Sequence, residues 1–398
     1  MDVSRTRQGR ARGRTRVAAA AVIGLCLLLV TWGAGPGSAS AAATPGVPSA
    51  TLTFGQTVPK SGPAALYGQS TYGVEAYFAY INDRSGVRGR KLRLISLDDK
   101  YQPAVSVQLT RDLLDKYRVF AEVAVNGSAP TEAVLTVLTP VNVPLIGPQS
   151  GATPVQSVFR KNLYNVWPSY VTEGKLLGKY AKDTLHLSRI GVLYQNDDFG
   201  KSLYDGVKEA GVTATVAIPY DPGQVDFGAQ AEQFKSAGCD GVIILAIPGP
   251  TISFLNAMAA IDYKPARLMS QTSAIPQSFS AAKSEFPGSY IGAFIPPLTE
   301  TSNPQVKLFL DSMAKYEPGK PASVFAAWGW TEAQVAVAGL KAIKGPITRD
   351  SYEAALDHIT GLQTLGGDVT YTPTSHAGIQ KMFMVIAKHG RLEPVPTE

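Results

Sequence analysis

The sequence has few residues of the kinds that bind metals or form covalent cross-links. It contains 2 cysteines and 4 histidines in 398 residues. Cys26 lies in an N-terminal stretch that we expect to be removed, which leaves Cys239 as the only cysteine of the mature chain. A single cysteine excludes an internal disulfide and argues against a thiolate metal site. The histidines have no metal-ligand spacing, so we expect no metal and no cofactor; they are His186, His358, His376 and His389.

The motifs of common nucleotide-binding and hydrolytic enzymes are missing. Residues 200–202 read Gly-Lys-Ser, but a phosphate-binding loop needs a glycine where Gln195 stands, and the acids before the turn would repel a phosphate. No G-x-S-x-G elbow marks a serine hydrolase. The acid pairs 98–99 and 197–198 follow predicted strands, where capping and solvated loop roles outweigh a general acid–base pair. We therefore expect no enzyme; a hydrolase, the remaining catalytic option, lacks a nucleophile–base pair.

Most of the chain carries little net charge. The formal net charge is +6, but residues 1–41 contain six arginines and a single acid, Asp2. The remainder holds 31 of the 37 Lys and Arg residues and 30 of the 31 Asp and Glu residues. Binding to nucleic acid needs a basic surplus that releases counterions. The charge balance therefore excludes nucleic acid as a partner.

The N-terminal segment has the order of a secretory signal. Its arginines precede the apolar run 17–32, which is followed by a Gly/Pro break and the small residues SASAAATPG. We expect a signal peptide over 1–41, cleaved near Ala41 or Ala43, a linker over 42–50, and a secreted or extracytoplasmic protein. A membrane anchor is the alternative, but the apolar run is short for a span. Its cysteine lacks the sequence context of a lipid-attached cysteine, so we predict no lipoprotein.

From residue 51 on, short apolar runs alternate with helical patterns such as 104–116 and 201–210. Several strand candidates are apolar nearly throughout, as parallel strands covered on both faces are. The strand candidates are 52–56, 92–98, 119–125, 143–147, 189–195, 212–218, 241–247, 267–271, 289–294 and 381–388. This alternation predicts an α/β fold with doubly wound parallel sheets.

The strand–helix units form two series, which predict two Rossmann-like lobes with a ligand site between them. From Pro304 the pattern is mostly helical before a last strand-like run returns to the second lobe. We expect lobe 1 over 51–167 and 297–367, and lobe 2 over 168–296 and 368–392. We expect three crossovers between the lobes, near Trp167, Pro296 and Asp368.

Two loops at predicted strand ends suit binding without reaction. Residues 126–133, NGSAPTEA, follow a strand and precede a helix, so Ser128 and the adjacent backbone N–H groups would form an anion seat at a helix N-terminus. Residues 147–154, GPQSGATP, are similar, because Gly151 allows close backbone approach and Ser150 adds a hydroxyl. An ordinary turn remains an alternative for the second loop.

Four stretches occur in the order and form found in a known family. They are SGPAALYG (61–68), AYFAYINDRSGVRGRKLRLISLDDKYQP (76–103), VPLIGPQSGA (143–152) and RIGVLYQNDDFGKSLYDGVKEA (189–210). Over nearly all of residues 51–390 the chain resembles the type I periplasmic solute-binding proteins of ABC transporters, the leucine/isoleucine/valine-binding group. The resemblance implies a Venus-flytrap fold of two lobes joined by three crossovers. It also implies a monomer that captures a small-molecule solute between the lobes and passes it to an ABC permease in the membrane.

A ligand-sensing extracellular receptor domain of the same fold is the alternative function. Receptors of that kind pass a signal across the membrane through an apolar span. No second apolar span follows residue 50, which counts against the receptor.

The resemblance also implies ligand-binding residues. Tyr67 falls in the first ligand loop of the family and would lie against the body of the solute, and Ser128 takes the place of a carboxylate-binding serine. The other positions implied are Gln149, Ser150 and Gly151 in a second polar loop, the aromatic Phe199 from the far lobe, and Thr272.

Two of these positions depart from the amino-acid binders of the family. Gly151 stands where those proteins carry a hydroxyl, and Thr272 stands where they carry an acid that faces the ligand ammonium. A buried ammonium without that acid would lose a charge-assisted bond of roughly 1.5 to 3 kcal/mol. We therefore expect another carboxylate-bearing or aromatic small molecule rather than an α-amino acid. The family's disulfide positions fall on Tyr101 and Gly127, neither of which is cysteine.

Overall fold

The computed structural model describes residues 50–62, 64–273 and 286–395. These residues belong to one compact unit. The predicted signal peptide and all but the last residue of the predicted linker lie outside the described residues. Among the described helices, none combines the length and the apolar character needed to cross a membrane.

The first sheet consists of five parallel strands in the order β2-β1-β3-β4-β5. They are β1 Thr51–Val58, β2 Lys91–Asp98, β3 Ala121–Val123, β4 Leu145–Ile146 and β5 Leu163–Tyr164. Side chains on both faces of β1 are buried, because helices cover both faces: Leu52, Phe54 and Val58 point to one face, and Thr53 and Thr57 point to the other.

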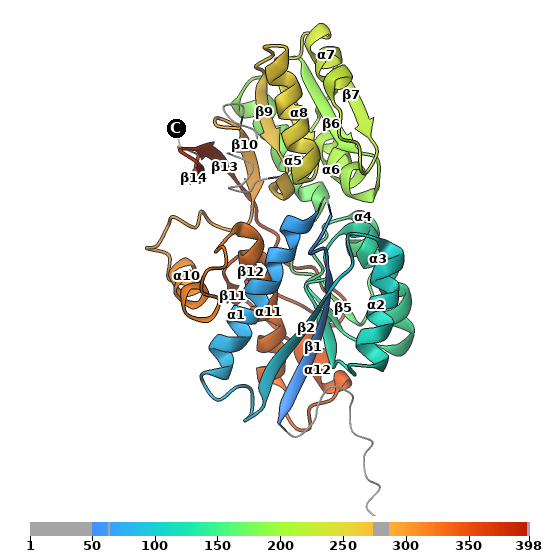
Figure 1. Ribbon diagram of the computed structural model, residues 1–398, viewed down its shortest axis with the longest axis vertical. Coiled ribbons are helices and arrows are strands. Elements are labelled where there is room, and N and C mark those ends of the chain that lie inside the picture. Colours follow the sequence, from blue (N-terminus) through green and yellow to red (C-terminus); the bar gives the residue numbers. More distant parts are fainter. Residues whose placement is uncertain (1–49, 63, 274–285, 396–398) are drawn as a thin grey trace, which may run out of the picture. The chain divides into compact units, whose positions relative to one another are not determined.

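Helices lie on both faces of this sheet (Figure 1). α1 (Ser70–Asn82) and α11 (Val324–Ala342) pack together on one face, and α2 (Pro103–Asp115) and α3 (Ser128–Leu138) pack together on the other. α11 is buried along most of its length, which places its side chains directly beneath the loops that leave β3 and β4.

The second sheet has seven strands in the order β14-β13-β10-β9-β8-β6-β7. β6 to β10 are mutually parallel, whereas β13 runs antiparallel to both β10 and β14. The strands are β6 Ile190–Gln195, β7 Val216–Tyr220, β8 Gly241–Leu245, β9 Ala266–Met269, β10 Tyr290–Ala293, β13 Phe383–Lys388 and β14 Arg391–Pro394. β13 therefore brings the end of the chain back to the second sheet.

Alternate residues of these strands enter two different apolar clusters. Val192 and Ile243 are neighbours in register and belong to the cluster that contains residues of α5 (Tyr170–Lys179) and α6 (Asp198–Glu209). The next residues along, Leu193 and Ile244, belong to the cluster of α7 (Gly228–Ser236) and α8 (Pro248–Ala260). Successive side chains of a strand point to opposite faces of the sheet, so α5 and α6 lie on one face and α7 and α8 on the other.

The remaining described elements connect or flank the two sheets. They are α4 Thr153–Gln156, α10 Pro304–Tyr316, α12 Arg349–Leu356, the hairpin β11 Leu362–Thr364 and β12 Gly367–Val369, and the short turns η1 Ala65–Gln69, η2 Thr139–Val141, η3 Tyr180–Thr184 and η4 Gln271–Ser273.

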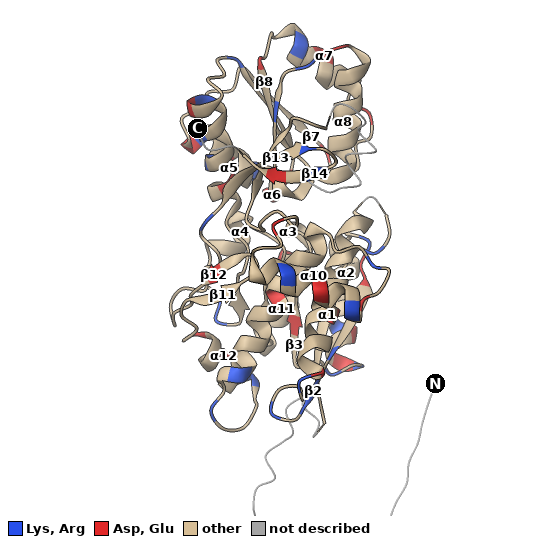
Figure 2. Ribbon diagram, turned by 90° about the vertical axis from the view of Figure 1, so that its left-hand side faces the viewer, with Lys and Arg blue, Asp and Glu red and all other residues tan. Residues whose placement is uncertain are grey.

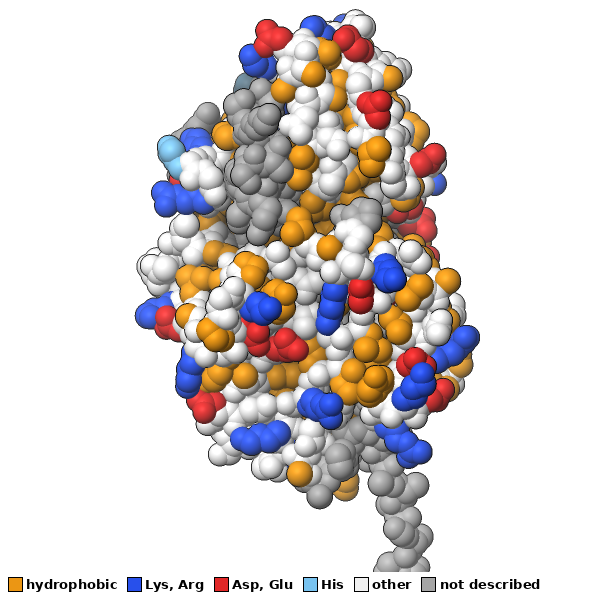
Figure 3. Space-filling model, in the orientation of Figure 1, with side chains coloured by type: hydrophobic (Ala, Val, Ile, Leu, Met, Phe, Trp, Pro, Cys, Tyr) orange, Lys and Arg blue, Asp and Glu red, His pale blue; other side chains and the backbone are white. Residues whose placement is uncertain are grey.

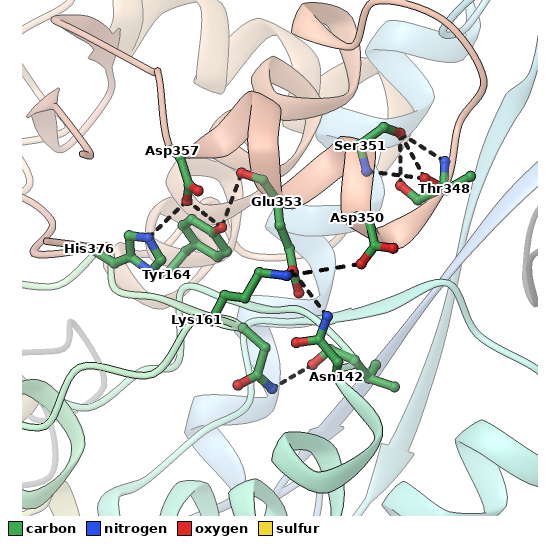
Figure 4. Close-up of polar contacts among 11 residues, drawn as sticks. Asn142, Lys161, Tyr164, Thr348, Asp350, Ser351, Glu353, Asp357 and His376 are labelled. Carbon is green, nitrogen blue, oxygen red and sulfur yellow. Dashed lines mark hydrogen bonds and ion pairs between the residues drawn. The ribbon is translucent and has the colours of Figure 1, made fainter. Parts of the chain in front are cut away.

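The segment between β12 and β13 is held by hydrogen bonds to β5 and to Asp357, the residue that follows α12. His376 has Nδ1 at 2.8 Å from the carbonyl oxygen of Leu163 and Nε2 at 2.9 Å from Oδ1 of Asp357, and its ring stacks on Tyr164. Figure 4 shows this group beside α12, with the neighbouring ion pair between Lys161 and Glu353. These contacts fix where the chain leaves the first sheet.

The α/β class and the doubly wound parallel sheets are confirmed. All ten predicted strands occur, although the run expected at 212–218 forms β7 at Val216–Tyr220. Four short strands were not predicted: β5, β11, β12 and β14. The exact lobe boundaries stay a prediction; Asp368 lies in the hairpin β11-β12, and the chain crosses from that hairpin to β13 after it.

Acidic and basic side chains are intermingled over the described surface. Figure 2 colours the positions of acidic and basic residues along the ribbon, where both kinds occur around the two sheets, and Figure 3 shows red and blue side chains interspersed on one face. This distribution agrees with the nearly even charge balance of the sequence.

Candidate functional site

The carboxyl ends of parallel strands from both sheets surround one small cavity. The first sheet reverses its strand order at β1 and the second at β6, and ligands of open α/β sheets bind at such reversal points. The cavity is lined by Tyr67, Tyr101, Asn126, Gly127, Gln149, Trp167, Tyr170, Phe199, Ile247 and Thr272. Nearly all of these residues lie in segments that directly follow a parallel strand. The topology therefore gathers residues from distant parts of the sequence at one point.

Half of the residues that line the cavity are aromatic. Tyr170 contacts Phe199 edge-on with ring centres 5.2 Å apart, and Trp167 lies 6.4 Å from Tyr170. The space that the centre of a water-sized sphere can occupy is about 10 Å³, which is room for about one water molecule. An organic solute can enter only if the walls contributed by the two sheets move apart.

Direct contacts join these two walls. The hydroxyl of Tyr67, which follows β1, donates to the carbonyl oxygen of Thr272, which follows β9, at 3.2 Å. The backbone N–H of Thr153 in α4 donates to Oγ of Ser202 in α6 at 3.0 Å. Ser202 belongs to the Gly-Lys-Ser sequence, and its hydroxyl also bonds to the carbonyl of Asp198, so this sequence forms a helix start.

Small polar residues lie behind the aromatic wall. Ser128 and Ser150 share a hydrogen bond of 2.9 Å between their hydroxyl oxygens, and both are buried. Burial raises the pKa of the Tyr170 phenol well above its usual value, against hydrogen bonds to the Gly151 backbone and the Ser128 side chain. These two serines and Gly151 thus lie directly beneath the cavity lining.

Gly127 occupies a position that only glycine fits. Its φ of +93° lies in the left-handed region, and a Cβ there would lie 2.5 Å from Cε2 of Tyr101. The ring of Tyr101 thus packs onto the loop that starts α3. These are the two positions at which the family resemblance would place a disulfide.

The described residues that line the cavity carry no charge. Two buried acids lie just behind the lining: Glu332 of α11 and Glu173 of α5. Burial raises the pKa of Glu332 well above its usual value, opposed by hydrogen bonds from Gln149 and Trp167. Burial raises the pKa of Glu173 to about 7, and one of its oxygens accepts from the backbone N–H of Gln271 at 2.7 Å. A solute meets hydroxyls, amides and rings before it meets either acid.

The structure brings all seven residues predicted from the sequence to this place. Four of them line the cavity, namely Tyr67, Gln149, Phe199 and Thr272, and Ser128, Ser150 and Gly151 lie behind the lining. The side chain of Thr272 is already engaged, because its hydroxyl donates to the carbonyl of Ala246 at 3.1 Å. Ligand contact by these residues stays a prediction.

Six of the lining residues are not among the ligand-binding residues predicted from the sequence. They are Tyr101, Asn126, Gly127, Trp167, Tyr170 and Ile247. The signal that could have found them is their place in the chain, because each lies at the end of a predicted strand, just after one, or near the predicted crossover at Trp167. An aromatic residue at such a place points into the crevice between the sheets.

Comparison with known proteins agrees with this geometry. A family model described as "Periplasmic binding protein" matches residues 51–391. The chain belongs to this family. The predicted family and fold are thereby confirmed, since solved relatives have the two-lobed fold of the type I periplasmic binding proteins.

Individual relatives of this periplasmic binding protein are distant in sequence and similar in fold. The Leu/Ile/Val-binding protein homolog 7 of Brucella suis biovar 1 is 25% identical over 315 residues, which cover 75% of this chain and 78% of that protein. The crystal structure of a possible leucine/isoleucine/valine-binding protein from Rhodopirellula baltica SH 1 has a TM-score of 0.80 at 22% identity, covering 87% of this chain and 96% of that one.

A third relative was solved with a ligand. It is an ABC transporter solute-binding protein from R. palustris in complex with benzoate, with a TM-score of 0.76 at 20% identity, covering 86% of this chain and 95% of that one. Members of the family bind small-molecule solutes outside the cytoplasm and work with ABC transporters.

Proposed function

We propose that this protein is the extracytoplasmic solute-binding component of an ABC importer and that it binds a small organic solute without changing its covalent bonds. The observation that carries the proposal is the cavity at the carboxyl ends of strands from both sheets, lined by rings and small polar groups. A solute held there contacts both sheets at once and stabilises their closed arrangement. The signal peptide expected over residues 1–41 supports export, and we propose a monomer that delivers its solute to a membrane permease.

The chemistry of the wall favours a ring-bearing or largely apolar solute with a carboxylate or similar oxygen group. Tyr67 and Phe199 offer aromatic surface from opposite walls. Ser128, the first residue of α3, and Ser150, in the loop after β4, offer hydroxyls for an oxygen group, and Gln149 and the Gly151 backbone add further polar contacts. The benzoate bound by a structural relative is a solute of this kind.

An α-amino acid fits this site poorly. Thr272 stands where an acid would face the ammonium, and its hydroxyl is committed to Ala246. The nearest acid on that side, Glu173, accepts hydrogen bonds from the backbone and side chain of Gln271. An ammonium would therefore have to break these bonds or remain without a carboxylate.

Titration calorimetry with amino acids, aromatic acids and short aliphatic acids tests the proposal. We expect at least one aromatic acid to bind, Ser128→Ala to weaken its binding about tenfold through a lost hydrogen bond, and the recovered solute to be chemically unchanged. Ser157→Ala, which removes an exposed hydroxyl bonded to Thr153, is the matched control and should bind normally. If Ser128→Ala leaves every affinity unchanged, the site assignment is wrong; turnover of the solute would contradict a binding role.

A further inference from the structure

Asn126 lines the cavity and carries a buried oxygen without a hydrogen-bond partner. Its side chain is 3% exposed, and Oδ1 has no hydrogen-bond partner among the described residues. A buried acceptor left without a donor costs about 1 to 3 kcal/mol. A solute group that donates a hydrogen bond to this atom would remove that cost.

A chain of buried hydrogen bonds fixes the orientation of this amide. The indole Nε1–H of Trp167 donates to Oε1 of Glu332 at 2.8 Å, and Nε2 of Gln149 donates to Oε2 of the same carboxyl at 2.9 Å. Oε1 of Gln149 then accepts from Nδ2 of Asn126 at 2.8 Å. We call these four side chains the amide relay. Each is at most 3% exposed, so water does not compete for these bonds.

The direction of the amide relay follows from donor counting. An indole can only donate, so Trp167 forces one oxygen of Glu332 to accept. In the ionised form of Glu332 the other oxygen also accepts, so Gln149 must turn its NH2 group toward Glu332 and its oxygen toward Asn126. Asn126 must then turn its NH2 group toward Gln149, which leaves its oxygen for the cavity. The carboxylate of Glu332 thus determines which end of a distant amide faces the solute.

We infer that Glu332 is a positioning residue that selects the solute: through Gln149 it holds the carbonyl oxygen of Asn126 toward the cavity, so a solute that donates a hydrogen bond there, from a hydroxyl or an N–H group, is preferred. This inference rests on the proposed function. It adds Asn126 to the expected ligand-binding residues and defines one group of the solute.

Replacing Glu332 by glutamine should reverse the amide relay. The amide oxygen of the new side chain must face Trp167, so its NH2 group faces residue 149, Gln149 turns round, and Asn126 offers its NH2 group to the cavity. Protonation of Glu332 on Oε2 would have the same effect. The other titratable side chains that line the cavity are the phenols of Tyr67, Tyr101 and Tyr170, which burial keeps in their neutral form by raising their pKa. Glu173 lies behind the lining; burial raises its pKa to about 7, and its hydrogen bonds go to Gln271 and not to the amide relay.

The double variant Gln149→Glu with Glu332→Gln should restore the original direction. The carboxylate at position 149 accepts from both neighbours, and the amide at 332 still accepts from Trp167 and donates to 149. Asn126 then points its oxygen to the cavity again. A role of Glu332 in packing alone predicts no such rescue, because the double variant keeps neither original side chain.

The first measurement needs no solute. In nitrogen-15 NMR spectra of the full mature chain, taken at about pH 7 and about pH 9, the Asn126 side-chain NH2 group should show contacts to Gln149 in the wild type. In Glu332→Gln it should instead show contacts to the rings of Tyr67 and Tyr101, and the double variant should match the wild type. Glu232→Gln, exposed on α7, is the control and should not change the signal. If wild type and Glu332→Gln agree at both pH values, the inference is overturned.

The second measurement uses the three hydroxybenzoates and their methyl ethers as probes in titration calorimetry. The wild type should bind one hydroxy compound about tenfold more tightly than its ether, Glu332→Gln should lose or reverse that ratio, and the double variant should regain it. Equal loss of affinity for both compounds in Glu332→Gln, with an unchanged ratio, contradicts the inference. If no probe binds the wild type, the proposed class of solute fails, and the NMR result alone decides the direction of the amide relay.

Discussion

The phenol of Tyr67 donates a hydrogen bond of 3.2 Å to the carbonyl oxygen of Thr272, 205 positions further along the chain. This bond connects the loop after β1 in the first sheet to η4, which follows β9 in the second. The centre of the Tyr67 ring lies 5.0 Å from the ring centre of Phe325 and 6.3 Å from that of Trp328, both on α11. Tyr67 is thus held by the first sheet and its helices and reaches across the cavity with its hydroxyl.

Tyr67→Phe should loosen the contact between the two sheets. The ring remains packed on α11, but the carbonyl of Thr272 loses its donor, so we expect a stability loss of about 1 kcal/mol. Urea unfolding followed by circular dichroism measures it. Tyr117→Phe removes a hydroxyl from a side chain that is 45% exposed and should cost nothing measurable. Equal stability of both variants would mean that the Tyr67 hydroxyl bond does not stabilise the closed arrangement.

Glu122→Gln should stabilise the protein in mildly alkaline solution. Glu122 is fully buried in β3, and burial raises its pKa from 4.5 to about 8. Between these values the unfolded chain releases a proton that the folded chain keeps, so wild-type stability falls by about 1.4 kcal/mol per pH unit from this group. Glutamine carries no such proton, and its advantage should grow as pH rises from 4.5 to 8.

Unfolding in urea at several pH values in this range measures the effect of Glu122→Gln. The control is Glu232→Gln on the exposed face of α7, which should leave the pH dependence as in the wild type. A constant difference between Glu122→Gln and wild type across the range would show that Glu122 does not hold its proton in the folded state.

Gly206→Ala should destabilise the second half of the protein. Gly206 of α6 and Gly174 of α5 face each other where these helices cross, and a Cβ at Gly206 would overlap the carbonyl oxygen of Val171. Forcing the helices apart should cost about 1 to 3 kcal/mol, visible as a lower urea midpoint. Gly228→Ala at the start of α7 places the same methyl group 3.5 Å from Oδ1 of Asp226, an ordinary contact distance, and should be neutral. An unchanged urea midpoint in Gly206→Ala would show that α5 and α6 can move apart at little cost in stability.

Asp357→Asn should weaken the attachment of the segment before β13. Oδ1 of Asp357 accepts from the Tyr164 hydroxyl at 2.7 Å and lies 2.9 Å from Nε2 of His376 (Figure 4). Loss of the charged acceptor at this mostly buried position should lower the free energy of unfolding by about 1 to 3 kcal/mol. Asp350→Asn is the matched control, because Asp350 lies in the first turn of α12, the helix that ends just before Asp357; its side chain is 85% exposed, and its Oδ1 lies 4.0 Å from Nζ of Lys161. Similar unfolding curves for the two variants would contradict the expected role of Asp357.

The sequence predicted the parts of the fold that local patterns encode. Long apolar runs such as β8 (Gly241–Leu245) are identifiable as strands because both of their faces are covered. Two-residue strands such as β5 (Leu163–Tyr164) have no periodicity of their own and exist through pairing with β4. Their recognition depends on tertiary structure, which explains why they were missed.

The same distinction holds at the candidate site. Tyr67 and Ser128 were expected because loops after strands and the family resemblance both indicated them. Glu332 was not, since an acid in the middle of α11 looks like an ordinary helix residue; only the packing of α11 under β4 brings it to Gln149. Contacts between side chains 183 positions apart leave no local pattern in the sequence.

The pairing of β13 with β10 has a consequence for synthesis and export. The strand that completes the second sheet is made only after the helices of the first sheet have been added. Until residue 388 has been synthesised, β10 therefore has an unpaired edge. If the chain folds in stages from its N-terminus, this edge can pair with strands of neighbouring chains and cause aggregation. Cells that make this protein in quantity should depend on chaperones or on export in an unfolded form to keep nascent copies apart.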